Sequence, residues 1–157
     1  MMAWPVAVVL AVVVTLLVAG ALIDVRTRRL PNWLSVLTLV ASVALVAVRS
    51  HSFTIIAGAT VHALLSLLVG MVLFRLRLVG GGDAKFYAGI AAGFPLASAA
   101  RLAFATAIVG LAAAVSWLVC RRAAGLRVRA SDDDVFTKFP LGVALSGGAL
   151  FLHMGLF

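Results

Sequence analysis

Residues 4–29 read WPVAVVLAVVVTLLVAGALIDVRTRR, an uncharged apolar run that ends in one aspartate and three arginines. A helix needs about 20 apolar residues to cross the hydrocarbon of a bilayer, and this run has that length. Arginines gather on the cytoplasmic side of membrane helices. Because a secretory signal carries its basic residues before the apolar run, this order predicts a retained membrane helix with its N-terminus outside.

The composition of the whole chain is typical of a membrane protein. Hydrophobic residues make up 64% of the 157 residues and charged residues only 11%, about half the charged share of an average soluble domain. The spacing of the charge-free runs predicts one transmembrane domain over residues 1–157. We expect an all-α bundle of six transmembrane helices, at about residues 4–23, 33–48, 53–74, 83–100, 102–120 and 139–157.

The formal net charge of +8 has a topological explanation. With the N-terminus outside, every basic residue except Arg49 and Arg101 lies in or beside three loops on the cytoplasmic side, at residues 24–32, 75–82 and 121–138. The basic clusters lack the stripe and the interleaved aromatic residues of a nucleic-acid surface. We therefore expect a multi-pass protein of the cytoplasmic (inner) membrane, with anionic lipid headgroups and no nucleic acid among its partners.

Asp24 and Asp83 stand out among the five acidic residues, because the predicted topology places both at the cytoplasmic boundary of the membrane. An ionisable residue there is costly unless it is paired or hydrated, which makes it a functional candidate. Two carboxyl groups held close share one proton, so one can accept a proton from water while the other polarises a carbonyl. The pair predicts aspartyl protease chemistry, with no metal and no cofactor.

Three segments carry a family resemblance: IDVRTRRLPN at residues 23–32, GGGDAK at residues 80–85, and FPLGVA at residues 139–144. Together they resemble the type IV prepilin peptidases, a family of GxGD membrane aspartyl proteases. The resemblance extends from the first predicted helix to the last.

The resemblance implies specific roles. Asp24 and Asp83 would be the catalytic pair, Gly80 and Gly82 the glycines of GxGD, and Lys85 the basic residue that follows the motif. The implied substrate is a prepilin, whose basic leader is removed at the cytoplasmic membrane face just before its apolar helix.

Larger family members also methylate the new N-terminus and carry an additional cytoplasmic region with paired cysteines. This chain has a single cysteine, Cys120, so the resemblance does not support methylation. The chain is similar to the compact forms that serve tight-adherence (Flp-type) pili, with the archaeal preflagellin peptidases as the alternative. The residues do not predict an oligomeric state.

The residues around the aspartates also have simpler explanations. Pro31 and Asn32 suit the start of a helix and would position Asp24 only indirectly. Lys85 either receives the acidic group that family substrates carry just after the cut or serves only as a topology signal. The glycines before Asp83 either admit a substrate strand or form a flexible turn.

A competing interpretation remains for the whole chain. In a non-enzymatic membrane protein, such as a small transporter or an assembly factor, Asp24 and Asp83 would bind a cation or relay protons. The run Asp132–Asp134 lacks the spaced ligands of a calcium loop. We expect that run to be a solvated loop, with attraction of a basic leader as the alternative.

Overall fold

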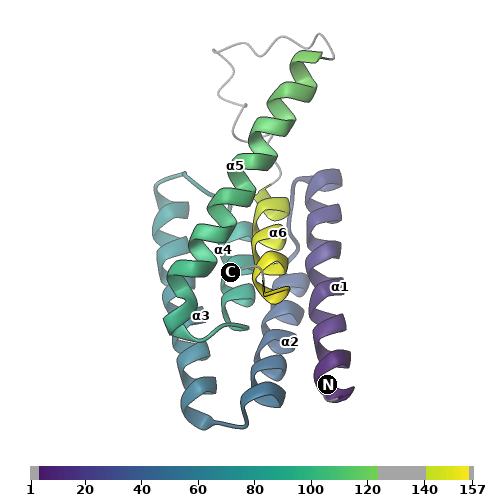
Figure 1. Cartoon of the computed structure of the whole chain (residues 1–157). Helices are drawn as coiled ribbons and strands as arrows, with labels where there is room; N and C mark the ends of the chain where they lie inside the picture. The colour runs from purple at the N-terminus through teal and green to yellow at the C-terminus, as the bar shows by residue number, and fades with distance from the viewer. Residues whose placement is uncertain (1–3, 124–140, 156–157) are drawn as a thin grey trace.

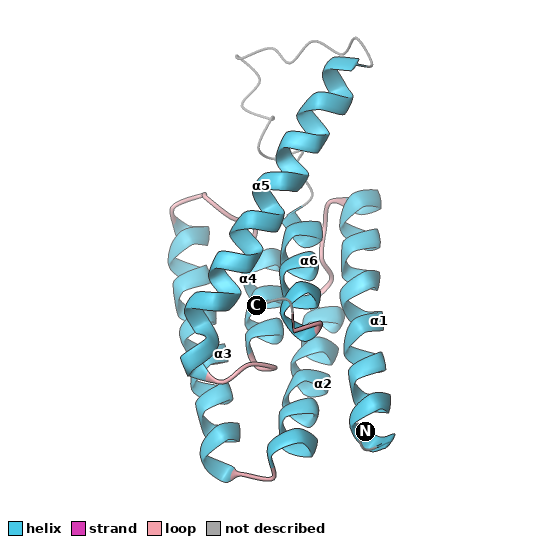
Figure 2. Cartoon of the chain, in the orientation of Figure 1, coloured by secondary structure: helices cyan, strands magenta, loops and turns pink. Residues whose placement is uncertain are grey.

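The computed structural model describes residues 4–123 and 141–155, and every regular element in them is helical (Figure 2). The elements are α1 (Trp4–Thr27), α2 (Asn32–Ser50), α3 (Phe53–Arg75), α4 (Gly81–Ala91), the short 3-10 helix η1 (Leu96–Ser98), α5 (Ala99–Ala123) and α6 (Leu141–His153). Four segments are long and apolar enough to cross a membrane, namely α1, α2, α3 and the stretch Leu96–Ala123 that includes α5. The predicted all-α membrane bundle is confirmed.

The helices run alternately up and down, so the end of α1 and the beginnings of α4 and α6 lie toward the same end of the bundle (Figure 1). The turn between α1 and α2 is tight. Arg28 adopts a left-handed conformation with φ of 55°, and Pro31 is the extended N-cap residue of α2. A proline in that position has no N–H to leave unpaired, so the helix can begin immediately after it.

The fourth helix is shorter than the sequence predicts. Residues 83–100 were expected to form one span, but α4 ends at Ala91 and α5 begins at Ala99. Pro95 accounts for the break, because proline lacks an N–H and disfavours the helical conformation of the residue before it. The 11 residues of α4, at 1.5 Å per residue, extend about 17 Å, which is short of the roughly 30 Å hydrocarbon core.

The last helix also differs from the predicted range. The sequence predicts a span at residues 139–157, whereas α6 covers Leu141–His153. Residues 139, 140, 156 and 157 lie outside the described part of the chain. Both short helices, α4 and α6, pack among longer ones (Figure 1).

Helix α4 occupies the centre of the bundle, in contact with α2, α3 and α6. Phe86 of α4 is completely buried in the main apolar cluster. Its ring lies against Gly20 of α1, where an added Cβ would come within 2.5 Å of the Phe86 Cζ atom. The absence of a side chain at Gly20 therefore lets α1 approach the central helix closely.

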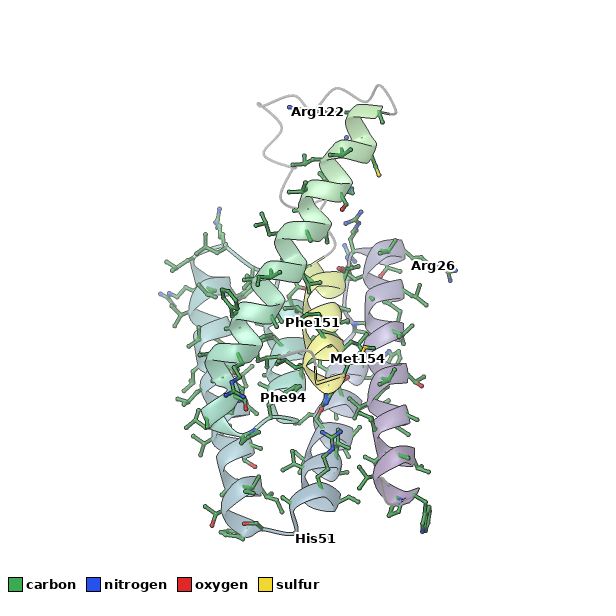
Figure 3. All side chains as sticks on the ribbon, viewed as in Figure 1. Arg26, His51, Phe94, Arg122, Phe151 and Met154 are labelled. Atoms are coloured by element: carbon green, nitrogen blue, oxygen red, sulfur yellow. The ribbon has the colours of Figure 1, made fainter. Side chains whose placement is uncertain are left out.

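The two ends of the bundle differ in charge. Arg26, near the end of α1, and Arg122, near the end of α5, lie toward one end, and His51 lies at the other (Figure 3). Arg49, in the last turn of α2, is near His51. Asp24, in the last turns of α1, is at the same end as Arg26. This distribution agrees with the positive-inside pattern, and the assignment of that end to the cytoplasm stays a prediction.

We expect Phe86→Ala to lower the free energy of unfolding by about 3–5 kcal/mol, because it leaves a cavity at the centre of the helix packing. Thermal unfolding of the purified protein in one detergent would measure the loss. Phe53→Ala is the matched control, since Phe53 is 84% exposed. Equal losses for the two variants would contradict the central position of α4.

Candidate active site

Asp24 lies in the last turn of α1. The sequence predicts that this helix ends at Ile23, but it continues to Thr27, so helical backbone fixes the position of the aspartate. Asp24 is only 5% exposed, and its Oδ2 atom accepts a hydrogen bond of 2.7 Å from the backbone N–H of Gly142. The positive charge of Arg28 also acts on this carboxyl group. Asp24 is therefore a buried carboxyl group with an identified donor.

Gly142 supplies that donor from the first turn of α6. The N–H groups of a first turn have no partner within their own helix, and the helix dipole favours negative charge near them. A Cβ at Gly142 would lie 2.8 Å from the Asp24 Cβ. A larger residue would push the carboxyl group away. The resemblance pointed to residues 139–144, but it did not predict this hydrogen bond.

Asp83 lies in the first turn of α4, outside the four candidate membrane spans. The backbone of Gly80, the N-cap residue of α4, hydrogen-bonds to its carboxyl group. Burial, and next the charge of Asp24, raise the pKa of Asp83 from 3.8 to about 6. Asp83 thus holds its proton to a higher pH than an exposed aspartate does.

The fold brings Asp24 and Asp83 close enough for their charges to interact. Each carboxyl group accepts a backbone N–H, from Gly142 and Gly80 respectively. The carboxyl oxygen that accepts the N–H cannot direct a proton at that same N–H. A proton shared by Asp24 and Asp83 therefore belongs on the carboxyl oxygens that do not accept these backbone bonds. Two carboxyl groups placed this way can combine one proton donor with one proton acceptor.

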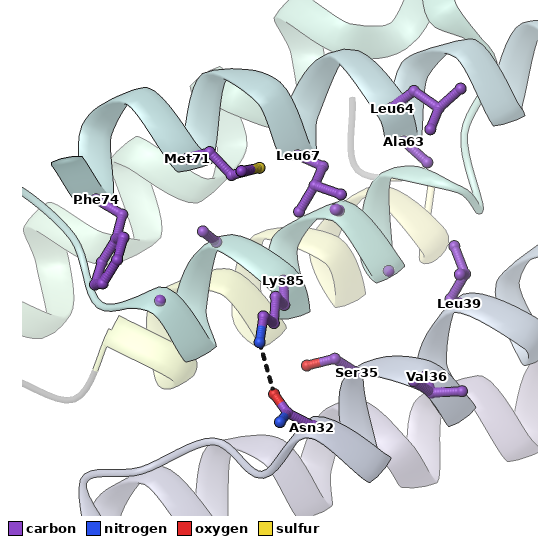
Figure 4. Close-up of a pocket in the computed structure, with 14 residues that line it drawn as sticks. Asn32, Ser35, Val36, Leu39, Ala63, Leu64, Leu67, Met71, Phe74 and Lys85 are labelled. Carbon is purple, nitrogen blue, oxygen red and sulfur yellow. Dashed lines mark hydrogen bonds between the residues drawn. The ribbon is translucent and has the colours of Figure 1, made fainter.

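Three of the residues that the sequence predicts to support the site lie where the start of α4 contacts the turn before α2, namely Gly82, Lys85 and Asn32. An added Cβ at Gly82 would lie 3.0 Å from the backbone oxygen of Leu30, so the two segments are in close contact. Lys85 donates a hydrogen bond of 3.0 Å from Nζ to Oδ1 of Asn32, directly after Pro31 (Figure 4). Lys85 thus contacts α2, a contact that the sequence did not predict.

A groove of about 660 Å³ lies beside this first turn, between α2, α3 and α4 (Figure 4). Sequence reasoning missed it, because its walls come from three helices that are separate in the chain. Its lining residues are Asn32, Ser35, Val36, Leu39, Ala63, Leu64, Leu67, Met71, Phe74, Gly81, Ala84, Lys85, Ala88 and Gly89.

The other candidates from the sequence lie elsewhere. Asp132–Asp134 fall outside the described residues. His62 of α3 is buried, and its Nδ1 lies 3.0 Å from the backbone oxygen of Phe94. Within residues 4–123 and 141–155, no group of three His, Cys, Asp or Glu side chains could hold a metal ion.

Comparison with known proteins identifies a family. The model of the type IV leader peptidase family matches residues 11–115, more than half of the chain, and this range includes both Asp24 and Asp83. No curated protein gives a significant match. No solved structure does either.

The contact between Leu30 and Gly82 can be tested directly. An added Cβ at Gly82 lies 3.3 Å from the Leu30 Cβ, close to the 3.5–4.5 Å separation of disulfide-bonded cysteines. We expect Leu30→Cys with Gly82→Cys, in a Cys120→Ser background, to form an intramolecular disulfide on mild oxidation. A shift in electrophoretic mobility that reducing agent reverses would detect it.

The matched control pairs Leu30→Cys with Gly58→Cys. Gly58 is a glycine of α3 that lies beside Leu96, at the far end of α4. Equal cross-linking of the two pairs would contradict the packing of the α1–α2 turn on the first turn of α4.

Proposed function

Because the chain belongs to the type IV leader peptidase family, we propose that it is a membrane aspartyl endopeptidase that removes the basic leader from prepilins. The observation that carries the proposal is the electrostatic interaction of Asp24 with Asp83 at one end of a membrane bundle. The positive-inside pattern supports the cytoplasmic (inner) membrane as its location. Resemblance alone supports prepilins of the Flp type.

In the proposed reaction, the ionised member of the pair takes a proton from water, and the resulting nucleophile attacks the scissile carbonyl. The protonated member donates a hydrogen bond to the carbonyl oxygen as negative charge develops on it. A tetrahedral gem-diol forms. When it collapses, the shared proton passes to the leaving amine and the peptide bond breaks.

The surroundings of the two carboxyl groups suit these roles. Gly142 and Gly80 donate backbone N–H groups that hold one oxygen of each carboxyl, so the orientation of the pair does not depend on flexible side chains. Burial makes simultaneous ionisation of Asp24 and Asp83 unfavourable. This cost favours the singly protonated pair that the proposed reaction needs.

We expect Asp24→Asn and Asp83→Asn each to reduce leader removal from a co-expressed prepilin by roughly 10²–10⁴-fold, because an amide can neither accept the proton from water nor donate the shared one. The readout is the ratio of precursor to mature pilin at equal membrane expression. Thr15→Val, an isosteric loss of a polar group at an exposed position of α1 where the hydroxyl bonds only to its own helix, should leave cleavage unchanged.

Cleavage by both Asp24→Asn and Asp83→Asn at the normal rate would contradict the protease assignment. Flux of ions or protons without cleavage, in vesicles that contain the purified chain, would favour the competing transporter interpretation.

We further expect Lys85→Ala to impair cleavage of a prepilin with an acidic residue just after the cut more than of one without it, by roughly five-fold. Among the described residues that line the groove, Lys85 is the one charged residue, and its Nζ can exchange Asn32 for a substrate carboxylate. The ratio of kcat/KM for the two substrates measures the pairing. Equal losses on both substrates would mean that Lys85 does not contact this acid.

A further inference from the structure

The groove between α2, α3 and α4 begins beside the first turn of α4, the turn that holds Asp83, although Asp83 itself does not line it. Gly81 and Lys85, from the first turns of α4, line one end of it, and they flank Asp83 in the sequence. From that end the groove follows α4 as far as Gly89. Gly81 and Gly89 are eight positions apart, which at 1.5 Å per residue corresponds to about 12 Å, or roughly two turns of a helix.

The walls of the groove are apolar and open to the surroundings of the bundle. Leu39 of α2 is 38% exposed, and Leu64 of α3 is 57% exposed. The floor is formed by small residues of α4, including Ala84 and Ala88. In membranes, small residues allow a second helix to approach closely. The groove thus has the shape and polarity that suit an apolar helix arriving from the lipid.

One end of the groove is polar, which a lipid chain would not require. Lys85 and Asn32 meet there through their hydrogen bond (Figure 4). The hydroxyl of Ser35, which is only 6% exposed, lines the groove and has no hydrogen-bond partner within the described residues. A buried hydroxyl without a partner is unfavourable. A polypeptide helix that begins at this end could donate one of its free first-turn N–H groups to the Ser35 hydroxyl oxygen, whereas an acyl chain could not.

We propose that this groove binds the first two turns of the apolar helix that follows the scissile bond of the substrate. The inference rests on the proposed function and adds where the substrate docks and how it arrives: laterally, between α2 and α3. The chain would leave the helix at the Lys85 end, cross the first turn of α4 near Gly81, and present its scissile bond to Asp24 and Asp83.

The test uses cysteine cross-linking of the full-length chain in liposomes. The probe is a synthetic peptide with a basic leader, a cleavage site and an apolar segment of about 20 residues, carrying one cysteine at successive positions. Leu64→Cys and Leu39→Cys are made separately with Cys120→Ser, and with Asp24→Asn so that the probe stays intact. Leu111→Cys on α5, at a position 68% exposed, is the matched control.

We expect both groove cysteines to cross-link to probe positions within roughly the first eight residues after the cleavage site, and not to later positions. Their yield should exceed that of Leu111→Cys by roughly ten-fold or more, because a bound helix holds its cysteine at a high effective concentration. Cleavage of the same probe by the chain with Asp24 intact is measured separately.

The outcomes separate the two proposals. If the chain cuts the probe but the groove cysteines cross-link no better than Leu111→Cys, the docking site is wrong and the protease function stands. If the groove cysteines cross-link as expected but the probe is never cut, the groove binds the apolar helix and the protease function is wrong. Labelling of Leu64→Cys by a photoactivatable phospholipid, undiminished by excess probe, would make the groove a lipid site and overturn the inference.

Discussion

A carboxyl group buried at the end of a membrane helix needs a partner, and the hydrogen bond from Gly142 to Asp24 provides it. Without a donor, a buried ionised carboxylate would cost several kcal/mol. The bond joins the end of α1 to the start of α6, across 118 residues of sequence. The bond depends on two properties of Gly142. The residue has no Cβ that would press against Asp24, and its N–H is free because it lies in the first turn of α6. The relative placement of the first and last described helices therefore depends on it.

The short central helix serves two purposes because it has two different faces. One face carries Phe86, which packs against α1 and fixes the depth of α4 in the bundle. The other carries Ala84 and Ala88, which form the floor of the groove. Asp83 lies in its first turn. The packing that anchors α4 thus also sets the position of Asp83 relative to the groove.

Hydrolysis within a membrane needs both water and an extended peptide at the same place. The first turn of α4 suits this combination, because it lies at the same end of the bundle as Arg26 and includes the glycines Gly81 and Gly82. The proposed docking groove keeps the apolar part of a substrate in contact with lipid and protein. Only the residues around the scissile bond would then have to unwind and reach the aspartates, which limits the cost of exposing backbone groups.

The sequence by itself determined the helical membrane bundle and the end at which Asp24 and Asp83 meet. Both follow from local patterns: apolar runs of spanning length, breaks between them, and the distribution of arginine. The starts of α1 and α3 were predicted to the residue, and that of α2 to within one. The sequence also contained the signal for the early end of α4, since Pro95 interrupts the run, but hydropathy alone does not register such a break.

Only the tertiary structure decided the hydrogen bond from Gly142 to Asp24, the contact of Lys85 with Asn32, and the groove beside α4. Each depends on how helices distant in the chain are rotated and how closely they approach. In α1 and α3 the hydrophobic pattern hardly specifies rotation, because lipid-facing and buried positions are almost equally apolar. Helix α2 is different, because its buried face carries Ser35, Thr38 and Ser42. Small residues and single hydrogen bonds determine the packing instead, and their partners become known only when the helices are assembled.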